Sequence, residues 1–260
     1  MPDPEELLAF ALELADEADA VTLPAFRAGA VAETKADGTP VTAADTGTEQ
    51  VLRRRIGQAY PDHSILGEEF GEQGGSGSAR WIIDPIDGTA SFARGIPIWA
   101  TLIAVEWDGQ LAAAVASAPA MHQRWWASRG GGAWTAETEA APRRLAVSTR
   151  ATLAESELLF ASLASLAKEG YGGKVHRLVG QVRRDRGLGD FWSYMLIAQG
   201  SAEIMIETGV HVWDLATPAL ILAEAGGRLT NFAGDSSYAG PTSLATNGLL
   251  HGPMLELLGG

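Results

Sequence analysis

Two aspartates, Asp84 and Asp87, stand three residues apart directly after an apolar run and are followed by a Gly-Thr pair. The apolar run predicts a buried strand whose end carries Asp84, and Pro85, which has no N–H group, is expected to end the strand pairing. Gly88 permits a tight turn, and the residues that follow it can open a short helix. Carboxylates suit hard cations, and the N–H groups at a helix N-terminus suit a phosphate. The segment therefore predicts a site for metal and phosphate, with an Asp-rich turn of no chemical function as the alternative.

Two further acidic groups follow apolar stretches elsewhere in the chain. Glu68 and Glu69 come after a short apolar strand, and Asp214 stands after an alternating apolar stretch at the point where a helical pattern begins. Taken singly, each of these acids is more typical of a helix cap or of a solvated carboxylate. Three acidic groups at the ends of elements, which a fold can direct to one point, together favour a two-metal site.

The ligand types available indicate which metal such a site takes. The chain has no cysteine, and its five histidines are scattered without paired spacing, so a zinc site of nitrogen and sulfur ligands is disfavoured. His211, near Asp214, is interpreted as a histidine at the entry of a helix or as a partly buried histidine. Ligands that are all oxygen favour Mg²⁺, with Mn²⁺ as a substitute. Two such cations about 4 Å apart can clamp a phosphoryl group, activate water and stabilise the leaving oxygen without a covalent intermediate.

The composition of the 260 residues is that of a soluble enzyme with a sizeable core, since 46% of them are hydrophobic and 20% are charged. The net charge of -13 argues against binding to nucleic acid, which requires a basic surface. No apolar run reaches the roughly 18 residues of a membrane-spanning helix, and the acidic N-terminus resembles neither a secretory signal nor a transit peptide. We therefore expect a cytoplasmic enzyme whose partner is a small molecule, with no binding to nucleic acid or to a membrane.

The elements that must position the acids alternate between helical and strand-like patterns. Thr42, with Asp45 three residues later, predicts the N-cap of a helix. We expect helices at residues 7–26, 42–60, 190–199 and 213–225, strands within 99–134 and at 143–147 and 228–230, a hairpin or loop at 33–40 and a mobile loop at 72–78. The pattern changes to shorter units near residue 149. This change predicts two lobes, residues 1–148 with most of the metal ligands and residues 149–260 with Asp214 and the substrate side of the pocket.

The motifs at these positions resemble those of the inositol monophosphatase family of Mg²⁺-dependent phosphomonoesterases. The motifs are TAAD at residues 42–45, GEE at 67–69, DPIDGT at 84–89, WD at 213–214 and EAGG at 224–227. They occur in the family's order over nearly the whole chain, from about Lys35 to about Asn247. The resemblance implies an α/β (α+β) fold, the layered αβαβα sandwich of the inositol monophosphatase and sugar phosphatase type.

The resemblance also implies roles for individual residues, and the metal ligands come first. Glu68, Asp84 and the carbonyl of Ile86 would hold a first cation. Asp84, Asp87 and Asp214 would hold a second cation, so that Asp84 bridges the two. We expect two or three Mg²⁺ ions in each active site.

Catalysis and phosphate binding are assigned to neighbouring residues in the same way. Asp45 and Thr89 would orient the attacking water through a hydrogen-bonded pair, with Glu68 as a third catalytic residue. The backbone N–H groups of Gly88 and Thr89 would hold the phosphate. Plain structural roles, Asp45 in a capping box and Thr89 as a helix N-cap, are the alternative. The residues expected to contact the substrate are Ile86, Asp87, Gly88, Thr89, Arg186, Asp190, Glu207 and Asp214.

Within the family the chain most resembles the bacterial histidinol-phosphatases. This closer resemblance rests on GDFWSY at residues 189–194, on residues 119–126 with their paired tryptophans, and on ATNG at 245–248. It implies hydrolysis of L-histidinol phosphate to L-histidinol and phosphate, a step of histidine biosynthesis. Asp190 and Glu207 would face the amine and the imidazole of this substrate, and Arg186 would lie near the phosphate or at the pocket rim.

Two other functions remain open from the sequence. One is hydrolysis of inositol 1-phosphate or another sugar phosphate, because Glu207 also matches a position that contacts inositol hydroxyls in the inositol enzymes. The pair Ala90-Ser91, where Thr-Asn is commonest in those enzymes, disfavours this function slightly. The other is a regulatory family member that mainly binds a partner, which requires a larger basic patch than RRDR at residues 183–186. We expect the enzyme to form a homodimer.

Overall fold

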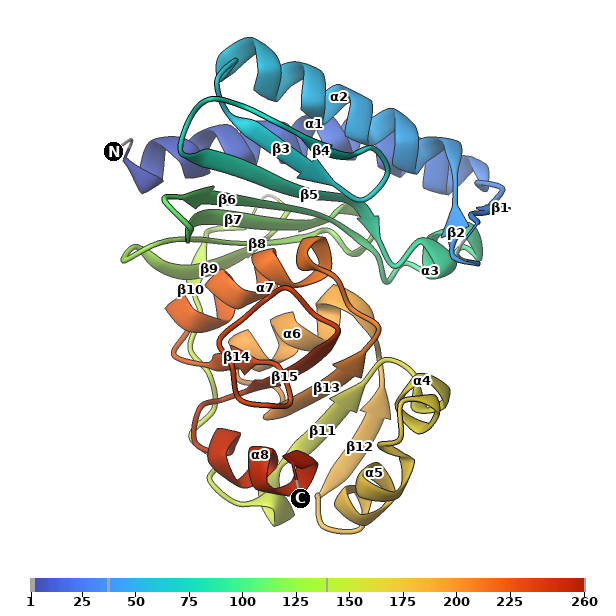
Figure 1. The fold of residues 1–260 in the computed structure, drawn as a ribbon, viewed down its shortest axis with the longest axis vertical. Helices are drawn as coiled ribbons and strands as arrows, with labels where there is room; N and C mark the ends of the chain where they lie inside the picture. Colours follow the sequence, from blue (N-terminus) through green and yellow to red (C-terminus); the bar gives the residue numbers. More distant parts are fainter. Residues whose placement is uncertain (1–2, 37, 139, 260) are drawn as a thin grey trace.

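The computed structural model describes residues 3–36, 38–138 and 140–259. Its elements are stacked in layers, with long helices outermost, then a large sheet, a second pair of helices, a smaller sheet and shorter helices (Figure 1). The helices are α1 (Pro4–Ala28) and α2 (Ala43–Ala59) in the first layer, α6 (Asp190–Ala198) and α7 (Val212–Glu224) in the middle layer, and α4 (Leu163–Lys168), α5 (Gly172–Val179) and α8 (His251–Gly259) in the last layer. This arrangement confirms the predicted αβαβα sandwich.

The large sheet brings two of the acidic motifs to the same edge. Across the sheet its strands are β10 (Arg143–Arg144), β9 (Gly132–Glu137), β8 (Gln123–Ser128), β7 (Gln110–Ala118), β6 (Ala100–Trp107), β5 (Ala79–Asp87), β3 (Ser64–Gly67) and β4 (Gly71–Gln73). The strands β3 and β5 run parallel, so their carboxyl ends point the same way. The N–H of Glu68 donates to the carbonyl of Ile83 at 3.3 Å, which places Glu68 beside the start of the aspartate segment.

Strand β5 is apolar because both of its faces are covered. Trp81 and Ile83 point into the core between the sheet and α1 and α2, whereas Ile82 points into the core that contains α6 and α7. Side chains alternate between the faces of a strand, so a strand buried on both sides reads as a continuous apolar run. The covered strand holds the carboxylates at its end in a fixed position.

The end of β5 differs from the prediction that pairing stops at Asp84. The strand continues to Asp87, which pairs with Ala100, and the register shifts between Asp84 and Asp87. Pro85 lies in this irregular stretch, and its carbonyl accepts a hydrogen bond of 2.8 Å from the hydroxyl of Thr101. The missing N–H of the proline therefore produces a bulge in the strand rather than its end.

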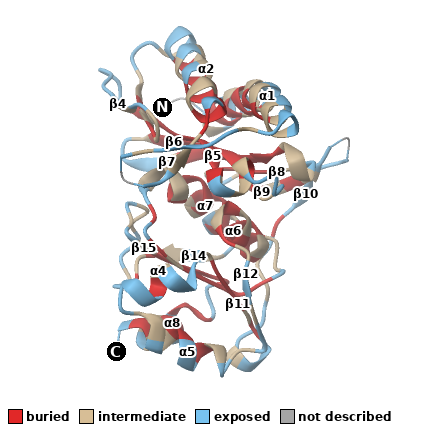
Figure 2. Ribbon diagram, turned by 90° about the vertical axis from the view of Figure 1, so that its right-hand side faces the viewer, coloured by how far each residue is buried: buried red, intermediate tan, exposed pale blue. Residues whose placement is uncertain are grey.

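The small sheet is mixed and supports the opposite wall of the site. Its order is β12 (Arg184–Gly187), β11 (Glu157–Phe160), β13 (Ile204–Thr208), β15 (Thr242–Thr246) and β14 (Arg228–Thr230). Apolar side chains from α4, α5 and α8 cover its outer face, and α6 contacts β13 and β15 from the inner side. Figure 2 shows that buried residues follow both sheets and the helices between them, while the outer helices expose one side.

The other predicted elements agree with the structure in most places. The predicted helix 42–60 is α2, which begins with the predicted capping box of Thr42 and Asp45. Strand β1 (Glu33–Thr34) pairs antiparallel with β2 (Pro40–Val41) as a hairpin. Two predictions were wrong in extent. The first residues of the predicted loop 72–78 belong to strand β4, which pairs with β3. The predicted strand 143–147 is shorter, since β10 spans only two residues. The short elements α3 (Thr89–Ala93), η1 (Pro119–Met121) and η2 (Leu153–Glu155) complete the fold.

Among the residues described by the structure, no helix combines the length and the apolar character that crossing a bilayer would require.

Candidate functional site

Three aspartates from two layers meet at the edge of the large sheet. Asp84 and Asp87 come from the end of β5, and Asp214 comes from the first turn of α7, which packs across β5 to β8. One carboxylate oxygen of each lies within 4.8 Å of the others. Asp84 is 1% exposed and Asp87 is 9% exposed, so these charges are largely removed from water. The structure therefore brings together three of the five predicted metal ligands as one acidic cluster.

The cluster has an electrostatic cost that a cation would relieve. Burial raises the pKa of Asp84 well above its usual value, and the neighbouring charges of Glu68, Asp87 and Asp214 raise it further. Burial raises the pKa of Asp87 in the same way, with Asp190 and Asp214 adding to it. Carboxylates that repel one another at this distance become favourable when they share a positive ion. The donor set contains only oxygen, so these residues fit a hard divalent cation.

Backbone groups hold the first two aspartates in place. Oδ1 of Asp84 accepts a hydrogen bond of 3.0 Å from the N–H of Ile86, and Oδ2 of Asp87 accepts one of 2.7 Å from the N–H of Phe191. Phe191 lies in the first turn of α6, so the second bond ties the end of β5 to the substrate-side helix. Asp214 is fixed within its own helix, where Oδ2 accepts from the N–H of His211 at 2.7 Å.

Glu68, the fourth carboxylate of the predicted metal site, is paired with a lysine. Nζ of Lys35 lies 2.8 Å from Oε1 of Glu68 and 2.7 Å from Oε1 of Glu69. Lys35 follows β1 in the hairpin that covers this edge of the site. Burial raises the pKa of Glu68, and the hydrogen bond from Lys35 acts in the opposite direction. The lysine thus supplies a positive charge at one side of the acidic cluster.

Thr89 and Asp45 form the predicted hydrogen-bonded pair. Oγ1 of Thr89 lies 3.0 Å from Oδ1 of Asp45 and 2.9 Å from the carbonyl of Ile86. The other oxygen of Asp45 accepts from the N–H of Thr42 at 2.8 Å, so this aspartate also closes the capping box of α2. The residue at the N-cap of α3 is Gly88 rather than Thr89. Asp45 therefore has the structural role that was its alternative, in a capping box, in addition to its contact with Thr89. Thr89 does not have its alternative role, because it is not the N-cap of α3.

Gly88 is required by the shape of the turn. Its φ of +85° lies in the left-handed region that favours glycine. A Cβ atom on this residue would lie 2.9 Å from the carbonyl oxygen of Ile98 and 3.2 Å from Oδ2 of Asp190. The glycine thus lets the turn after β5 approach α6, where the substrate-side acids begin.

A cavity of about 370 Å³ opens onto Asp87 and Asp214 and continues toward the small sheet. Asp190 from α6 and Glu207 from β13 line it together with Asp87 and Asp214. Burial, with the charge of Asp214 added, raises the pKa of Asp190 to about 6. Burial raises the pKa of Glu207 to about 8, although the hydroxyl of Tyr194 donates to its Oε2 at 2.8 Å. The metal-side and substrate-side acids therefore share one cavity.

Arg186, a predicted substrate-binding residue, does not line this cavity. It is exposed on β12, the edge strand of the small sheet, and its Nη1 donates to the carbonyl of Asp185 at 2.6 Å. The role of Arg186 in substrate binding stays a prediction. Asp190, by contrast, reaches the cavity from a strained backbone, with a φ of +48° that is uncommon for a residue other than glycine.

Several residues of the site were not predicted. Lys35 and Tyr194 line the cavity and pair with its acids, and Trp213 and His211 form part of the wall. The rings of His211 and Trp213 are stacked with centroids 4.9 Å apart. His211 is exposed and is the N-cap of α7, so the helix-entry interpretation holds and the partly buried one does not. Lys35 could have been identified as a site residue from its position just before the TAAD motif. The contact of Tyr194 with Glu207 depends on packing between α6 and β13, which the sequence pattern does not show.

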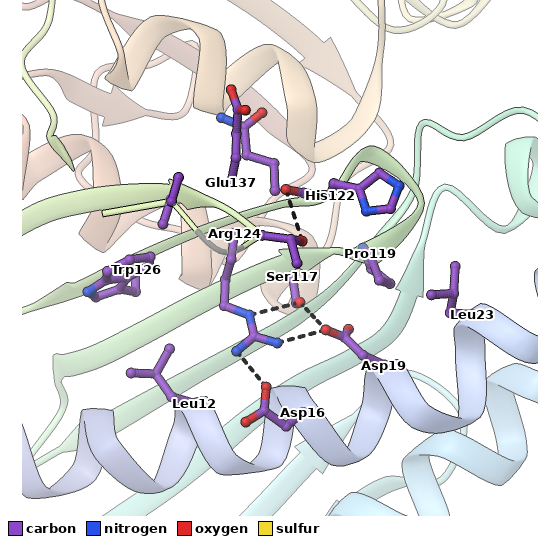
Figure 3. A pocket seen from close by; sticks show the side chains of 14 residues that line it. Leu12, Asp16, Asp19, Leu23, Ser117, Pro119, His122, Arg124, Trp126 and Glu137 are labelled. Atoms are coloured by element: carbon purple, nitrogen blue, oxygen red, sulfur yellow. Dashed lines mark hydrogen bonds and ion pairs between the residues drawn. The ribbon is translucent and has the colours of Figure 1, made fainter. Parts of the chain in front are cut away.

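A second and larger cavity, about 560 Å³, lies between α1 and strands β7 to β9, and its described lining shares no residue with the first. Figure 3 shows the guanidinium of Arg124 between two aspartates of α1. Its nitrogens lie 2.8 Å from Asp16 and 2.7 Å from Asp19, and its Nε lies 3.0 Å from the hydroxyl of Ser117. The positive charge of Arg124 is therefore already paired. Because the clustered carboxylates border the smaller cavity, we place the chemistry there.

Comparison with known proteins gives a consistent result over the whole chain. Residues 3–257 match the inositol monophosphatase family. A histidinol-phosphatase of Mycobacterium tuberculosis is 45% identical, over 96% of this chain and 97% of its own. A histidinol-phosphatase of Streptomyces coelicolor is 41% identical, over 99% and 98%. The solved structure of an IMPase of Thermotoga maritima superposes with a TM-score of 0.86 at 26% identity, over 98% of this chain and 97% of that one.

Proposed function

Because the chain belongs to the inositol monophosphatase family, we propose that it hydrolyses L-histidinol phosphate to L-histidinol and phosphate in histidine biosynthesis. Two relatives that bear the name histidinol-phosphatase match it almost end to end, at 45% and 41% identity. The observation that carries the proposal is the single cavity in which Asp87 and Asp214 lie together with Asp190 and Glu207. One end of this cavity suits a phosphate with its cations, and the other end suits a positively charged leaving group.

The proposed cofactor is Mg²⁺, two or three ions per site, with Mn²⁺ as a substitute. Glu68, Asp84 and the carbonyl of Ile86 would hold one ion, and Asp84, Asp87 and Asp214 would hold another. The all-oxygen donor set and the mutual repulsion of the aspartates support this assignment. When bound, the ions supply positive charge that stabilises the transferring phosphoryl group and the leaving oxygen, and they make water more acidic.

The chain itself would position the attacking water. A threonine hydroxyl has one hydrogen and two lone pairs, so Thr89 can donate to Asp45 and still accept a hydrogen bond from water. Asp45 is buried, and burial raises its pKa, which makes its carboxylate a better proton acceptor than an exposed aspartate. The N–H groups of Gly88 and Thr89 would hold the phosphate at the start of α3. Glu68 would act in catalysis beside its role as a ligand.

The substrate side distinguishes a cationic ester from a neutral one. With a pKa of about 6, Asp190 is mostly ionised at neutral pH, whereas Glu207, with a pKa of about 8, is mostly protonated. Asp190 is therefore the carboxylate that can pair with the amine of histidinol phosphate. The pair of Glu207 and Tyr194 presents neutral hydrogen-bonding groups that suit the imidazole.

The proposal is tested by phosphate release from L-histidinol phosphate by the purified protein, with Mg²⁺ present and with chelator in its place. We expect turnover that depends on the metal. No phosphate release at any Mg²⁺ concentration would contradict the proposed function. Inositol 1-phosphate and a set of sugar phosphates, assayed in parallel, test the second candidate substrate class, for which the position of Glu207 is the supporting observation.

Three further properties belong to the same proposal. We propose a cytoplasmic enzyme that forms a homodimer, with lobes at residues 1–148 and 149–260 that meet at the site. The large sheet formed within the first range and the small sheet formed within the second support this division. Size-exclusion chromatography with light scattering tests the dimer, and limited proteolysis near residue 149 tests the boundary between the lobes.

A further inference from the structure

We infer that Glu49 is a positioning residue that holds the turn after β3, so that Glu68 faces the aspartates. This inference rests on the proposed function, because it takes Glu68 as a metal ligand. Glu49 lies in α2 and contacts none of the three clustered aspartates through a hydrogen bond that the described structure contains. Its effect would therefore pass through the backbone of the residues next to Glu68.

The carboxylate of Glu49 is buried and bound to that backbone. The side chain is 0% exposed. Its Oε2 accepts a hydrogen bond of 2.7 Å from the N–H of Glu69, and its Oε1 accepts one of 3.2 Å from the N–H of Phe70. Both N–H groups belong to the turn that joins β3 to β4, directly after Glu68. Hydrogen bonds from N–H groups to an ionised carboxylate are stronger than neutral ones, so this contact can fix the turn.

A matching cation and a matching glycine complete the arrangement. Nε of Arg53 donates to Oε1 of Glu49 at 2.7 Å, and its Nη2 also donates to the carbonyl of Gly71 at the end of the turn. A Cβ atom on Gly67 would lie only 2.1 Å from Oε1 of Glu49. The glycine before Glu68 is therefore the residue that gives the carboxylate room to reach the turn. The ion pair in turn stabilises a charge that would otherwise be buried alone.

Glu49 stands one helical turn after Asp45 in α2, on the same face. Asp45 contacts Thr89, as described above, and Glu49 contacts the turn next to Glu68. One rigid helix thus sets the relative positions of a proposed metal ligand and a proposed water-orienting residue. Partners of this kind, which hold a ligand without touching the metal, commonly determine metal affinity.

The test replaces Glu49 by glutamine and measures Mg²⁺ binding by calorimetry. The side-chain amide has one oxygen and one NH₂ group, so in either orientation a donor faces the N–H of Glu69 or that of Phe70. We expect the Kd for Mg²⁺ to rise roughly 10- to 100-fold, and the Mg²⁺ concentration for half-maximal activity to rise with it. Gly67→Ala disturbs the same contact from the opposite side, so it should also raise the Kd for Mg²⁺. This variant is measured instead if Glu49→Gln does not fold.

Glu203→Gln is the matched control. Glu203 is also a fully buried glutamate, and it accepts from one backbone N–H, that of Glu157 at 2.8 Å, and from one arginine, Arg150 at 2.8 Å. It lies at the small sheet, away from the acids. We expect this variant to lose stability without a change in Mg²⁺ affinity.

The outcomes separate the inference from the proposed function. Wild-type Mg²⁺ affinity in folded Glu49→Gln, or an equal loss in Glu203→Gln, would overturn the positioning role of Glu49 while the metal site stands. A wild-type protein that binds no Mg²⁺ would overturn the proposed function, and the inference with it.

Discussion

The hydroxyl of Thr89 lies 3.0 Å from Oδ1 of Asp45, although 44 residues separate the two in sequence. Thr89 begins α3 after the end of β5, Asp45 lies in the first turn of α2, and both side chains are buried. The contact therefore joins the outer helical layer to the edge of the large sheet where the aspartates meet. This pair can orient water, and the charge of Asp45 also adds to those that raise the pKa of Asp84.

Replacement of Thr89 by valine removes this hydroxyl at nearly constant volume. We expect kcat to fall roughly 10²- to 10⁴-fold, the usual range for the loss of positioned proton transfer. The Kd for Mg²⁺, measured by calorimetry, should change little, because no carboxylate is removed. Thr89→Ser keeps the hydroxyl and should restore most of the activity. Valine and serine variants with equal kcat would show that the hydroxyl takes no part in the reaction.

Removal of metal should destabilise the wild-type protein and not the variant Asp84→Asn. Mg²⁺ at 100 times its Kd would add about 2.7 kcal/mol to the free energy of unfolding, which is several degrees in Tm. Asp84→Asn lacks the proposed bridging carboxylate, so its Tm should be the same in Mg²⁺ and in chelator, and its kcat/KM should fall at least ~10³-fold, or about 4 kcal/mol. Thermal melts of both proteins with and without Mg²⁺ provide the check. A wild-type Tm that is the same in Mg²⁺ and in chelator would contradict a shared metal site.

Glu207 should make stability depend on pH. Burial raises its pKa to about 8, from an unfolded value near 4.5. Between these values the folded protein keeps a proton that the unfolded chain has lost, so the contribution of this group to the free energy of unfolding falls as the pH rises. Glu207→Gln, which is neutral throughout, should therefore gain in Tm relative to wild type between about pH 6 and about pH 8.5. A constant Tm difference over this range, measured by calorimetry in chelator, would disprove the assignment.

The sequence predicted those residues of the candidate site that a local pattern specifies. It did not predict those that reach the site only through packing between distant segments. Asp84, Asp87 and Asp214 were identified because each follows an apolar stretch that must end at the edge of a sheet or the start of a helix. The predicted end of β5 was wrong because strand pairing continues past Pro85. The hydroxyl of Thr101, which is distant in sequence, donates a hydrogen bond to the carbonyl of Pro85 in this stretch.

The partners of the acids were harder to predict for the same reason. Lys35 meets Glu68 across 33 residues, and a sequence pattern does not specify such a contact. The contact of Glu49 with the turn after β3 depends on the absence of a side chain at Gly67, which only the assembled structure shows. The resemblance implied a place for Arg186 near the phosphate or at the pocket rim. In the structure it is exposed on β12, the edge strand of the small sheet, and its role in substrate binding stays a prediction.

Asp190 should determine the preference for a cationic substrate. A charge-assisted hydrogen bond to the amine contributes about 1.5 to 3 kcal/mol. Asp190→Asn should therefore lower kcat/KM for L-histidinol phosphate roughly 10- to 100-fold. The same variant should hydrolyse p-nitrophenyl phosphate, which has no amine, almost as fast as wild type. Equal losses on the two substrates would mean that Asp190 supports the fold or the metal site instead.

The substrate preference of the wild-type protein is the decisive test of the proposed function. The measurement is kcat/KM for L-histidinol phosphate and for inositol 1-phosphate, in the same preparation at saturating Mg²⁺. Since the cavity offers an ionised carboxylate to an amine that inositol lacks, we expect a value at least ~10-fold higher for L-histidinol phosphate. A higher kcat/KM for inositol 1-phosphate would contradict the substrate assignment and leave only the phosphatase chemistry in place.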